Sequence, residues 1–208
     1  MFKREGLALP LSVKRQVGFS LTELIVALLV AMILMAVGLP IFLRAYHAYQ
    51  LSNAALQVAD ILRLTRYEAI RLNKPVNCVM QPSGSYPGMT VLWADSNGNG
   101  IQDPTEKMIL LGTGGNLVDQ GSVPGYSALL SAAVGSAATT APSPSSPPIQ
   151  IRFDARGALS PPTSVNVNVF YLASSIAPDA GYRAVLLMPA GSIQIWSADG
   201  AGYWQEQR

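Results

Sequence analysis

The feature that most constrains this chain is an apolar run near its N-terminus. The twenty residues from Leu24 to Leu43 carry no charge, and Gly38 and Pro40 are the only interruptions. An α-helix rises about 1.5 Å per residue, so a helix of this length spans roughly the 30 Å of a bilayer's hydrocarbon core. The run therefore predicts a membrane-spanning helix.

Basic residues around the run predict its orientation. Arg44 is the only nearby base that follows it, whereas four bases precede it: Lys3, Arg4, Lys14 and Arg15. Because positively charged flanks stay in the cytoplasm, we expect a cytoplasmic N-terminus and an extracytoplasmic remainder. A secretory signal peptide is the alternative, but its apolar core has only about 7–15 residues and ends in a small-x-small cleavage site. This run is longer and is not followed by such a cleavage site.

Composition indicates a single domain that is held together by burial. The 208 residues suffice for one domain of ordinary size plus an appendage, and only 12% of them are charged. Cys78 is the only cysteine, so no intramolecular disulfide can form, and we expect it to be a small buried residue on a strand. His47 is the only histidine and has no evident nucleophilic partner, so we expect no enzyme.

A motif stands just before the apolar run. A basic leader ends at Gly18, and the segment Phe19-Ser20-Leu21-Thr22-Glu23 joins directly onto the run. This segment resembles the processing site of type IV prepilins and type II secretion pseudopilins. The resemblance implies that residues 1–18 are a leader, that prepilin peptidase cuts after Gly18, and that Phe19 becomes N-methylphenylalanine. Glu23 is then the fifth residue of the mature chain.

An acid in this apolar context has a physical explanation. A carboxylate at the edge of the hydrocarbon costs about 2–3 kcal/mol or more unless it is paired, so Glu23 indicates a functional site. The resemblance implies that its partner is the α-amine of Phe19 on a neighbouring subunit. The alternative is an ordinary signal anchor whose Glu23 reaches out to the interface. The motif favours assembly, as does Pro40, which stands at the family's usual mid-helix kink.

An apolar stripe continues beyond the membrane run. Its residues recur at spacings of three, four or seven: Leu51, Ala55, Val58, Leu62 and Ala69. This periodicity predicts one helix from about Phe19 to Leu72, roughly 80 Å long, that ends at Asn73-Lys74-Pro75. Residues 19–43 form its membrane half and residues 44–74 an amphipathic half, whose stripe needs cover. We expect its other faces to be polar, since they carry Gln57, Asp60, Arg63, Arg66 and Glu68.

Strand-like runs follow the helix and supply that cover. They are rich in β-branched and aromatic residues and are separated by Gly, Pro, Asn and Ser. The runs are Val76–Met80, Met89–Ala94, Met108–Leu111, Ile149–Phe153, Val165–Leu172, Ala184–Met188 and Ile193–Trp196. We expect an α+β fold in which residues 75–208 form a β-rich head, with an antiparallel sheet packed on the second half of the helix.

A low-complexity insert of Ala, Ser, Pro and Thr interrupts the head at residues 127–148. Its Pro-rich second half has too little apolar surface for a packed core. We therefore expect a mobile loop there.

Within the head the resemblance narrows. Arg66–Val76, a tryptophan strand that runs into an Asp/Asn/Gly loop, and Ile151–Gly157 are similar to the GspH/FimT group of minor pilins and minor pseudopilins. The resemblance implies a low-abundance subunit at or near the tip of a type IV pilus, acting in its assembly. It also implies an inner-membrane anchor with a periplasmic head, and partnership with other minor and major pilins through the helix. A pseudopilin of a type II secretion system and a tip-displayed receptor for DNA uptake are the alternatives.

The loop after the tryptophan strand has the spacing of a calcium-binding loop. The candidate ligands are side-chain oxygens of Asp95, Asn97, Asn99 and Asp103, the carbonyl of Ile101 and the carboxylate of Glu106. No helices are expected on either side, and Asn-Gly pairs are common in hairpin turns, so a polar turn is the alternative. Calcium would be weakly bound and structural, and the fold requires no cofactor.

Nucleic-acid binding has little support in the sequence. Without residues 1–18 the chain keeps ten bases and eleven acids, a formal charge of −1, whereas phosphate binding needs clustered bases. DNA-binding members of the family carry a basic glycine-arginine motif near the C-terminus, but the corresponding segment Gly191–Gln194 has no base. Trp196, Tyr203 and Trp204 could stack on bases, yet we expect them in the sheet core or at a packing edge.

Overall fold

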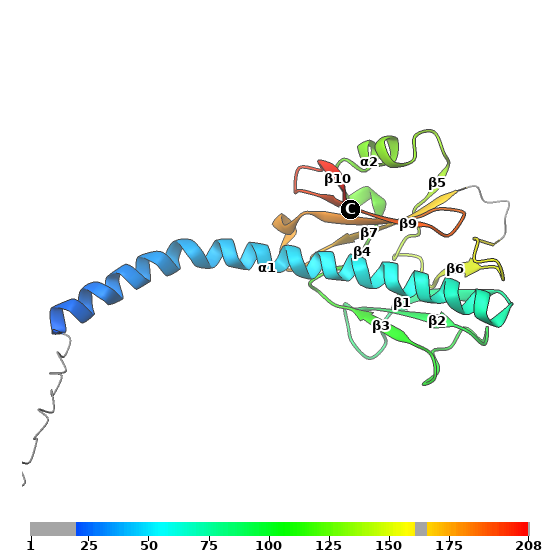
Figure 1. Cartoon of the computed structure of the whole chain (residues 1–208), viewed down its shortest axis with the longest axis horizontal. Coiled ribbons are helices and arrows are strands. Elements are labelled where there is room, and N and C mark those ends of the chain that lie inside the picture. The colour runs from blue at the N-terminus through cyan, green and yellow to red at the C-terminus, as the bar shows by residue number, and fades with distance from the viewer. Residues whose placement is uncertain (1–19, 161–165, 208) are drawn as a thin grey trace, which may run out of the picture. The chain divides into compact units, whose positions relative to one another are not determined.

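The computed structural model describes residues 20–160 and 166–207 (Figure 1). Its first element is α1, Leu21–Leu72, a helix of 52 residues. The helix that the sequence predicts is therefore confirmed from Leu21 onward. Gly18 and Phe19, the two residues of the expected processing site, lie outside the described residues.

Local hydrogen bonds explain both ends of α1. Ser20 Oγ accepts the backbone N–H of Glu23 at 3.2 Å, which satisfies one free donor of the first turn. At the other end Asn73 has a φ of +50°, in the left-handed region. Lys74 then donates its N–H to the carbonyl of Ala69 at 3.2 Å, the bond that commonly closes a helix after a left-handed residue.

The chain divides into two compact units, Met1–Ile41 and Phe42–Arg208, and α1 contributes to both. In the first unit, residues Leu21–Ile41 are helical, and each side chain is exposed except that of Ala31, which is half-buried. The second unit holds the remainder of α1 and all the strands of the described chain.

Four strands form the first sheet of the second unit. Their order is β3-β2-β1-β6, and all neighbours are antiparallel. The strands are β1 Val76–Pro82, β2 Thr90–Asp95, β3 Met108–Leu111 and β6 Ile149–Phe153. Each of them coincides with a run that the sequence predicts.

Six strands form the second sheet. Five follow the antiparallel order β10-β9-β8-β7-β4, and β5 pairs in parallel with β7. The strands are β4 Asn116–Val118, β5 Thr139–Thr140, β7 Val167–Ala173, β8 Tyr182–Leu187, β9 Ile193–Ala198 and β10 Trp204–Gln207. Two short 3-10 helices lie in the connections, η1 Gln120–Ser122 and η2 Pro178–Ala180. The expectation of one sheet was wrong, because the head divides its strands between two.

The main core lies between α1 and the two sheets. In Figure 1 the second half of the helix runs between the strands β1–β3 and the strands of the second sheet. The predicted stripe is confirmed, because five of its residues have no exposed surface: Leu51, Ala55, Val58, Leu62 and Ala69. They share one cluster with residues of both sheets, among them Met80, Leu92, Phe170 and Val185.

A second, smaller core lies on the face of the second sheet that points away from α1. The insert supplies the helix α2, Tyr126–Ala133, whose fully buried Leu129 shares a cluster with Val169, Tyr171 and Leu186. Thr139 and Thr140 pair with β7, so the expectation of an unpacked loop was wrong there. The sequence did not predict α2, because eight helical residues among alanines and serines are too few to show a periodic pattern.

One carboxylate holds the Pro-rich part of the insert. Asp119 Oδ1 accepts the hydroxyl of Ser143, and Oδ2 accepts the hydroxyl of Ser145 at 2.5 Å. These hydrogen bonds, with that of Ser143 the strongest, lower the pKa of Asp119 because they favour its charged form.

The cysteine and the C-terminal aromatic residues were all expected to be buried or packed. Cys78 is buried in β1, as expected, and burial raises its pKa to about 12. Trp196 and Trp204 pack against the second core, and the Trp204 and Tyr171 rings meet edge-on with centroids 6.3 Å apart. Tyr203 is 74% exposed, so the expectation of a packed side chain was wrong for this residue. Its place in the turn before β10 points it outward.

Candidate functional site

The first half of α1 is an apolar surface without cover. Residues Leu21–Ile41 include one charged side chain, Glu23, and their large hydrophobic side chains are at least 49% exposed, from Ile25 at 49% to Leu21 at 75%. Among the described residues, α1 is the one helix that is long and apolar enough to cross a membrane. A continuous apolar surface of this size indicates contact with lipid or with other proteins.

Glu23 lies in the first turn of α1. An acid is favourable here because the free N–H groups of a helix start carry partial positive charge. Within the described residues no base lies within ion-pair distance of its carboxylate. The predicted partner, the α-amine of Phe19 on another subunit, lies outside the described residues, so this pairing stays a prediction. The cleavage site after Gly18 stays a prediction for the same reason.

Pro40 lies inside α1, as the sequence predicts. Its ring has no N–H, so one backbone hydrogen bond of the helix is missing at this point. The helix nevertheless continues on both sides, and neighbouring side chains from Leu39 to Phe42 are exposed.

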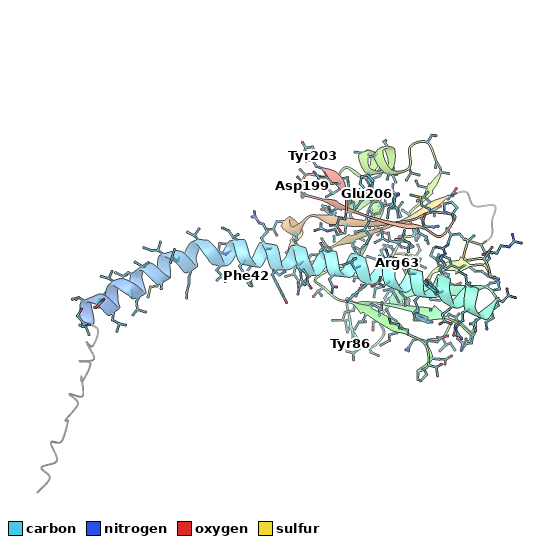
Figure 2. The ribbon with its side chains drawn as sticks, viewed as in Figure 1. Phe42, Arg63, Tyr86, Asp199, Tyr203 and Glu206 are labelled. Atoms are coloured by element: carbon cyan, nitrogen blue, oxygen red, sulfur yellow. The ribbon has the colours of Figure 1, made fainter. Side chains whose placement is uncertain are left out.

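In the second unit, α1 presents an outward stripe that the sequence analysis missed. Its exposed residues alternate at spacings of four and three: Phe42, Tyr46, Tyr49, Asn53, Leu56, Asp60, Arg63, Tyr67 and Ile70. Figure 2 labels Phe42 and Arg63 on this helix. The stripe carries six large apolar or aromatic side chains, although this face was expected to be polar. The signal was present in the regular recurrence of tyrosine opposite the buried stripe.

Local contacts order the start of the outward stripe. The rings of Phe42 and Tyr46 stack with centroids 6.5 Å apart, and Tyr46 lies 5.9 Å from the ring of His47. His47 Nδ1 is 3.4 Å from Gln50 Oε1, so the imidazole contacts a neighbour on the same helix. Further along, Arg63 donates to Asp60 at 3.0 Å, an exposed pair worth about 0.3–0.5 kcal/mol.

The Asp/Asn/Gly loop closes on itself through its own polar groups. Asp95 is almost fully buried; its Oδ1 accepts the N–H of Gly98 at 2.7 Å and its Oδ2 that of Gly100 at 3.0 Å. Asp103 Oδ2 accepts the side-chain amides of Asn97 at 2.5 Å and Asn99 at 2.9 Å. The loop is therefore an ordered turn whose carboxylates already have donors.

The remaining predicted calcium ligands behave in the same way. Glu106 Oε1 accepts the N–H of Ser96 at 2.8 Å, and its Oε2 accepts the N–H of Asp103 at 3.2 Å. Ile101 donates its N–H to Asn99 Oδ1, and its side chain is 67% exposed. In residues 20–160 and 166–207 no group of three or more His, Cys, Asp or Glu side chains is arranged to hold a metal. This geometry fits the polar turn, and calcium binding stays a prediction.

The segment Gly191–Gln194 packs onto α1 through a base from the helix. Arg66 Nη1 donates to the carbonyl of Gly191 at 3.1 Å. Gly157 and Gly191 both have a φ near +80°, and a Cβ on either would lie 2.8 Å from Arg66 Nε. These two turns therefore require glycine, and the half-buried Arg66 serves packing.

Comparisons with known proteins found one family and one solved structure that are similar to this chain. The model of the family described as type II transport protein GspH matches residues 54–191. Among solved structures, the type IV minor pilin FimU of Pseudomonas aeruginosa is similar, with 18% sequence identity and a TM-score of 0.45. That match covers 77% of this chain and 94% of the FimU chain. A search of curated protein sequences gave no match.

Proposed function

Since the chain belongs to the GspH family of pilin-like proteins, we propose that it is a minor pilin, a structural subunit at or near the tip of a type IV pilus that acts in pilus assembly. Filament subunits of this family are structural, and the proposal includes no catalytic role.

The main support for this proposal is that the first half of α1 is apolar and exposed, whereas the head buries its own hydrophobic cores. Residues Leu21–Ile41 have no buried side chain, whereas the head encloses its own cores. Apolar surface of this extent is unstable in water. A subunit that is stored in the membrane and later packed among the helices of a filament needs both parts.

Maturation follows from the motif at the start of the helix. We propose that prepilin peptidase cuts between Gly18 and Phe19 and that Phe19 is N-methylated. The Glu23 carboxylate then pairs with the α-amine of a neighbouring subunit inside the filament, because an unpaired charge in an apolar environment is costly. Before assembly the chain is a single-pass protein of the bacterial inner membrane with a periplasmic head.

A pseudopilin of a type II secretion system is the second candidate. The description of the matching family, type II transport protein GspH, supports it. Both candidates use the same architecture, and they differ in the machine that receives the subunit.

The test is a deletion strain complemented with the tagged chain. We expect the deletion to reduce surface pili in the sheared fraction and the tagged chain to appear in that fraction at low abundance. Loss of exoprotein secretion with normal pili would instead establish the pseudopilin. Normal piliation together with normal secretion would overturn both candidates.

Peptide mass spectrometry of the recovered chain tests the maturation step. We expect a terminal peptide that starts at N-methylated Phe19, and we expect Gly18→Leu to retain the leader. A native chain that starts at any other residue would contradict the proposed processing site.

A further inference from the structure

Arg183 is a buried cation without an anion beside it. It lies in β8 and is only 8% exposed. Its Nε donates to Ser52 Oγ at 3.1 Å, and its Nη1 donates to the carbonyl of Tyr182 at 2.8 Å. Among the described residues no carboxylate lies within 4.0 Å of the guanidinium. A buried charge is costly unless an opposite charge compensates it. The guanidinium of Arg183 therefore has a place for an anionic partner.

The charge balance around Arg183 supports the same conclusion. Burial lowers the pKa of Arg183, and no acidic group contributes an opposing shift. Asp179, in the 3-10 helix just before β8, is bound to Arg44 at 3.2 Å. The acid nearest in sequence is therefore engaged elsewhere.

Three hydrogen-bond donors lie side by side at this position of the second sheet. Arg183 is opposite Ser197 of β9, and Ser197 is opposite Gln205 of β10. Residues directly opposite on antiparallel strands point to the same face, with Cβ atoms about 4.5–5.5 Å apart. A guanidinium, a hydroxyl and an amide thus form a row. The hydroxyl of Ser197 donates to the carbonyl of Gln205 at 3.5 Å, whereas the guanidinium and the side-chain amide of Gln205 can donate to an oxygen ligand.

A pocket of about 310 Å³ opens over this donor row. Tyr203 and Asp199 also line it, together with two alanines, and Figure 2 labels both near the end of the head that is closest to Phe42. Asp199 Oδ1 accepts the N–H groups of Ala201 and Tyr203, both at 3.0 Å. The one acid in the lining is therefore held by its own turn.

We propose that this pocket binds a carboxylate, which in the assembled filament is an acidic side chain of an adjacent subunit. Two of the five N–H donors of the guanidinium are bound to Ser52 and Tyr182, and those that remain on Nη1 and Nη2 can bind the two oxygens of a carboxylate; the side-chain amide of Gln205 adds a further donor. The identity of the neighbour rests on the proposed function, whereas the carboxylate chemistry does not.

Thermal unfolding of the full-length chain in detergent tests the chemistry. The probe is N-acetylglutamate amide, and its neutral counterpart N-acetylglutamine amide is the matched control at equal ionic strength. We expect the glutamate compound alone to raise the melting temperature, by about 2–4 °C near saturation, and Arg183→Gln to abolish the rise. Equal responses to the two compounds, or an unchanged response in Arg183→Gln, would overturn the proposal.

If Arg183→Gln does not fold, the variant Asp199→Asn tests whether the pocket binds a carboxylate. Removing a negative charge from the pocket is expected to produce the same rise at a several-fold lower probe concentration. If Asp199 were instead the counter-charge of Arg183, this variant would melt at a lower temperature and would respond no more strongly. That outcome would overturn the proposal.

Photo-crosslinking identifies the source of the carboxylate. Tyr203, which is 74% exposed, is replaced by p-benzoylphenylalanine in cells that make filaments. We expect an adduct with an acidic segment of another subunit. If the chain is in filaments and melts higher with the glutamate compound but forms no adduct, the occupant is a soluble carboxylate and the neighbour assignment is wrong. If the chain is absent from filaments, the proposed function fails while the melting result stands.

Discussion

The two halves of α1 have the same helical backbone and opposite surroundings. Leu34 in the first half is 68% exposed, whereas Leu62 in the second half has no exposed surface. The second half finds its partners in the two sheets of the same unit, whereas none of the side chains of Leu21–Ile41 is buried. An apolar side chain that the fold covers has its partner within the chain, whereas one that stays exposed points to a partner outside it. Each prediction below asks whether the partner of a given group lies inside or outside the chain.

The largest expected effect comes from Glu23, whose predicted partner lies outside the chain. We expect Glu23→Ala to insert into the membrane normally and to be incorporated into filaments at least about tenfold less, since a charged pair in an apolar environment is worth more than about 1.4 kcal/mol. Quantitative immunoblots of membrane and sheared filament fractions measure both steps.

Thr22→Ala is the matched control, because Thr22 is exposed in the same turn. It should assemble at the parental level. If Glu23→Ala assembled as well as Thr22→Ala, the pairing between subunits would be disproved.

A matched pair of leucine variants tests the contrast directly. We expect Leu62→Ala to lower the free energy of unfolding of the head by about 3 kcal/mol, since it leaves a cavity in a fully buried site. Leu34→Ala should change it by less than about 0.5 kcal/mol, because the side chain of Leu34 is exposed. Urea unfolding of the full chain in detergent, followed by tryptophan fluorescence, to which the buried Trp93 contributes, measures both. Similar losses in the two variants would show that the two halves of α1 contribute equally to the stability of the head.

The parts of the fold that were predictable are those with long periodic signals. The stripe from Leu51 to Ala69 predicted α1 and its buried face, and runs of β-branched residues predicted the longer strands. The strands β4 and β5 have only three and two residues, too few for a pattern, and three of the four residues of β10 are polar. Division into two sheets depends on pairing between distant segments, which no local pattern contains.

The candidate site shows the same limit. The motif at Gly18, Phe19 and Glu23 is local in sequence and could be identified there. The outward stripe of α1 was missed because Asp60 and Arg63 among its residues suggested a solvated face. Arg183 gave no sequence signal, because its burial and its alignment with Ser197 and Gln205 follow from strand register.

Asp119 tests a smaller internal contact, the attachment of the insert. We expect Asp119→Asn to lower the free energy of unfolding at neutral pH by about 1 kcal/mol, because it weakens the hydrogen bonds from Ser143 and Ser145. The pKa of Asp119 is lowered in the folded chain, so its contribution is present above the ordinary pKa of an aspartate and is lost as the pH falls through the lowered value. The gap between parent and variant should therefore close in acid. Urea unfolding at several pH values measures it, and a gap that stays constant would contradict the assignment.

The smallest expected effect concerns calcium and the Asp/Asn/Gly loop. Asp95, Asp103 and Glu106 all accept hydrogen bonds from their own loop, so their partners already lie inside the chain. We expect millimolar calcium to shift the melting temperature by less than about 1 °C relative to a chelator, since an ion gains little where these donors must first be displaced. Asp103→Asn is the control, because it removes one charge and keeps the shape of the side chain. A rise of several degrees that Asp103→Asn abolishes would show that the loop rearranges around an external ion. The partner of the loop would then lie outside the chain, as we propose for the first half of α1.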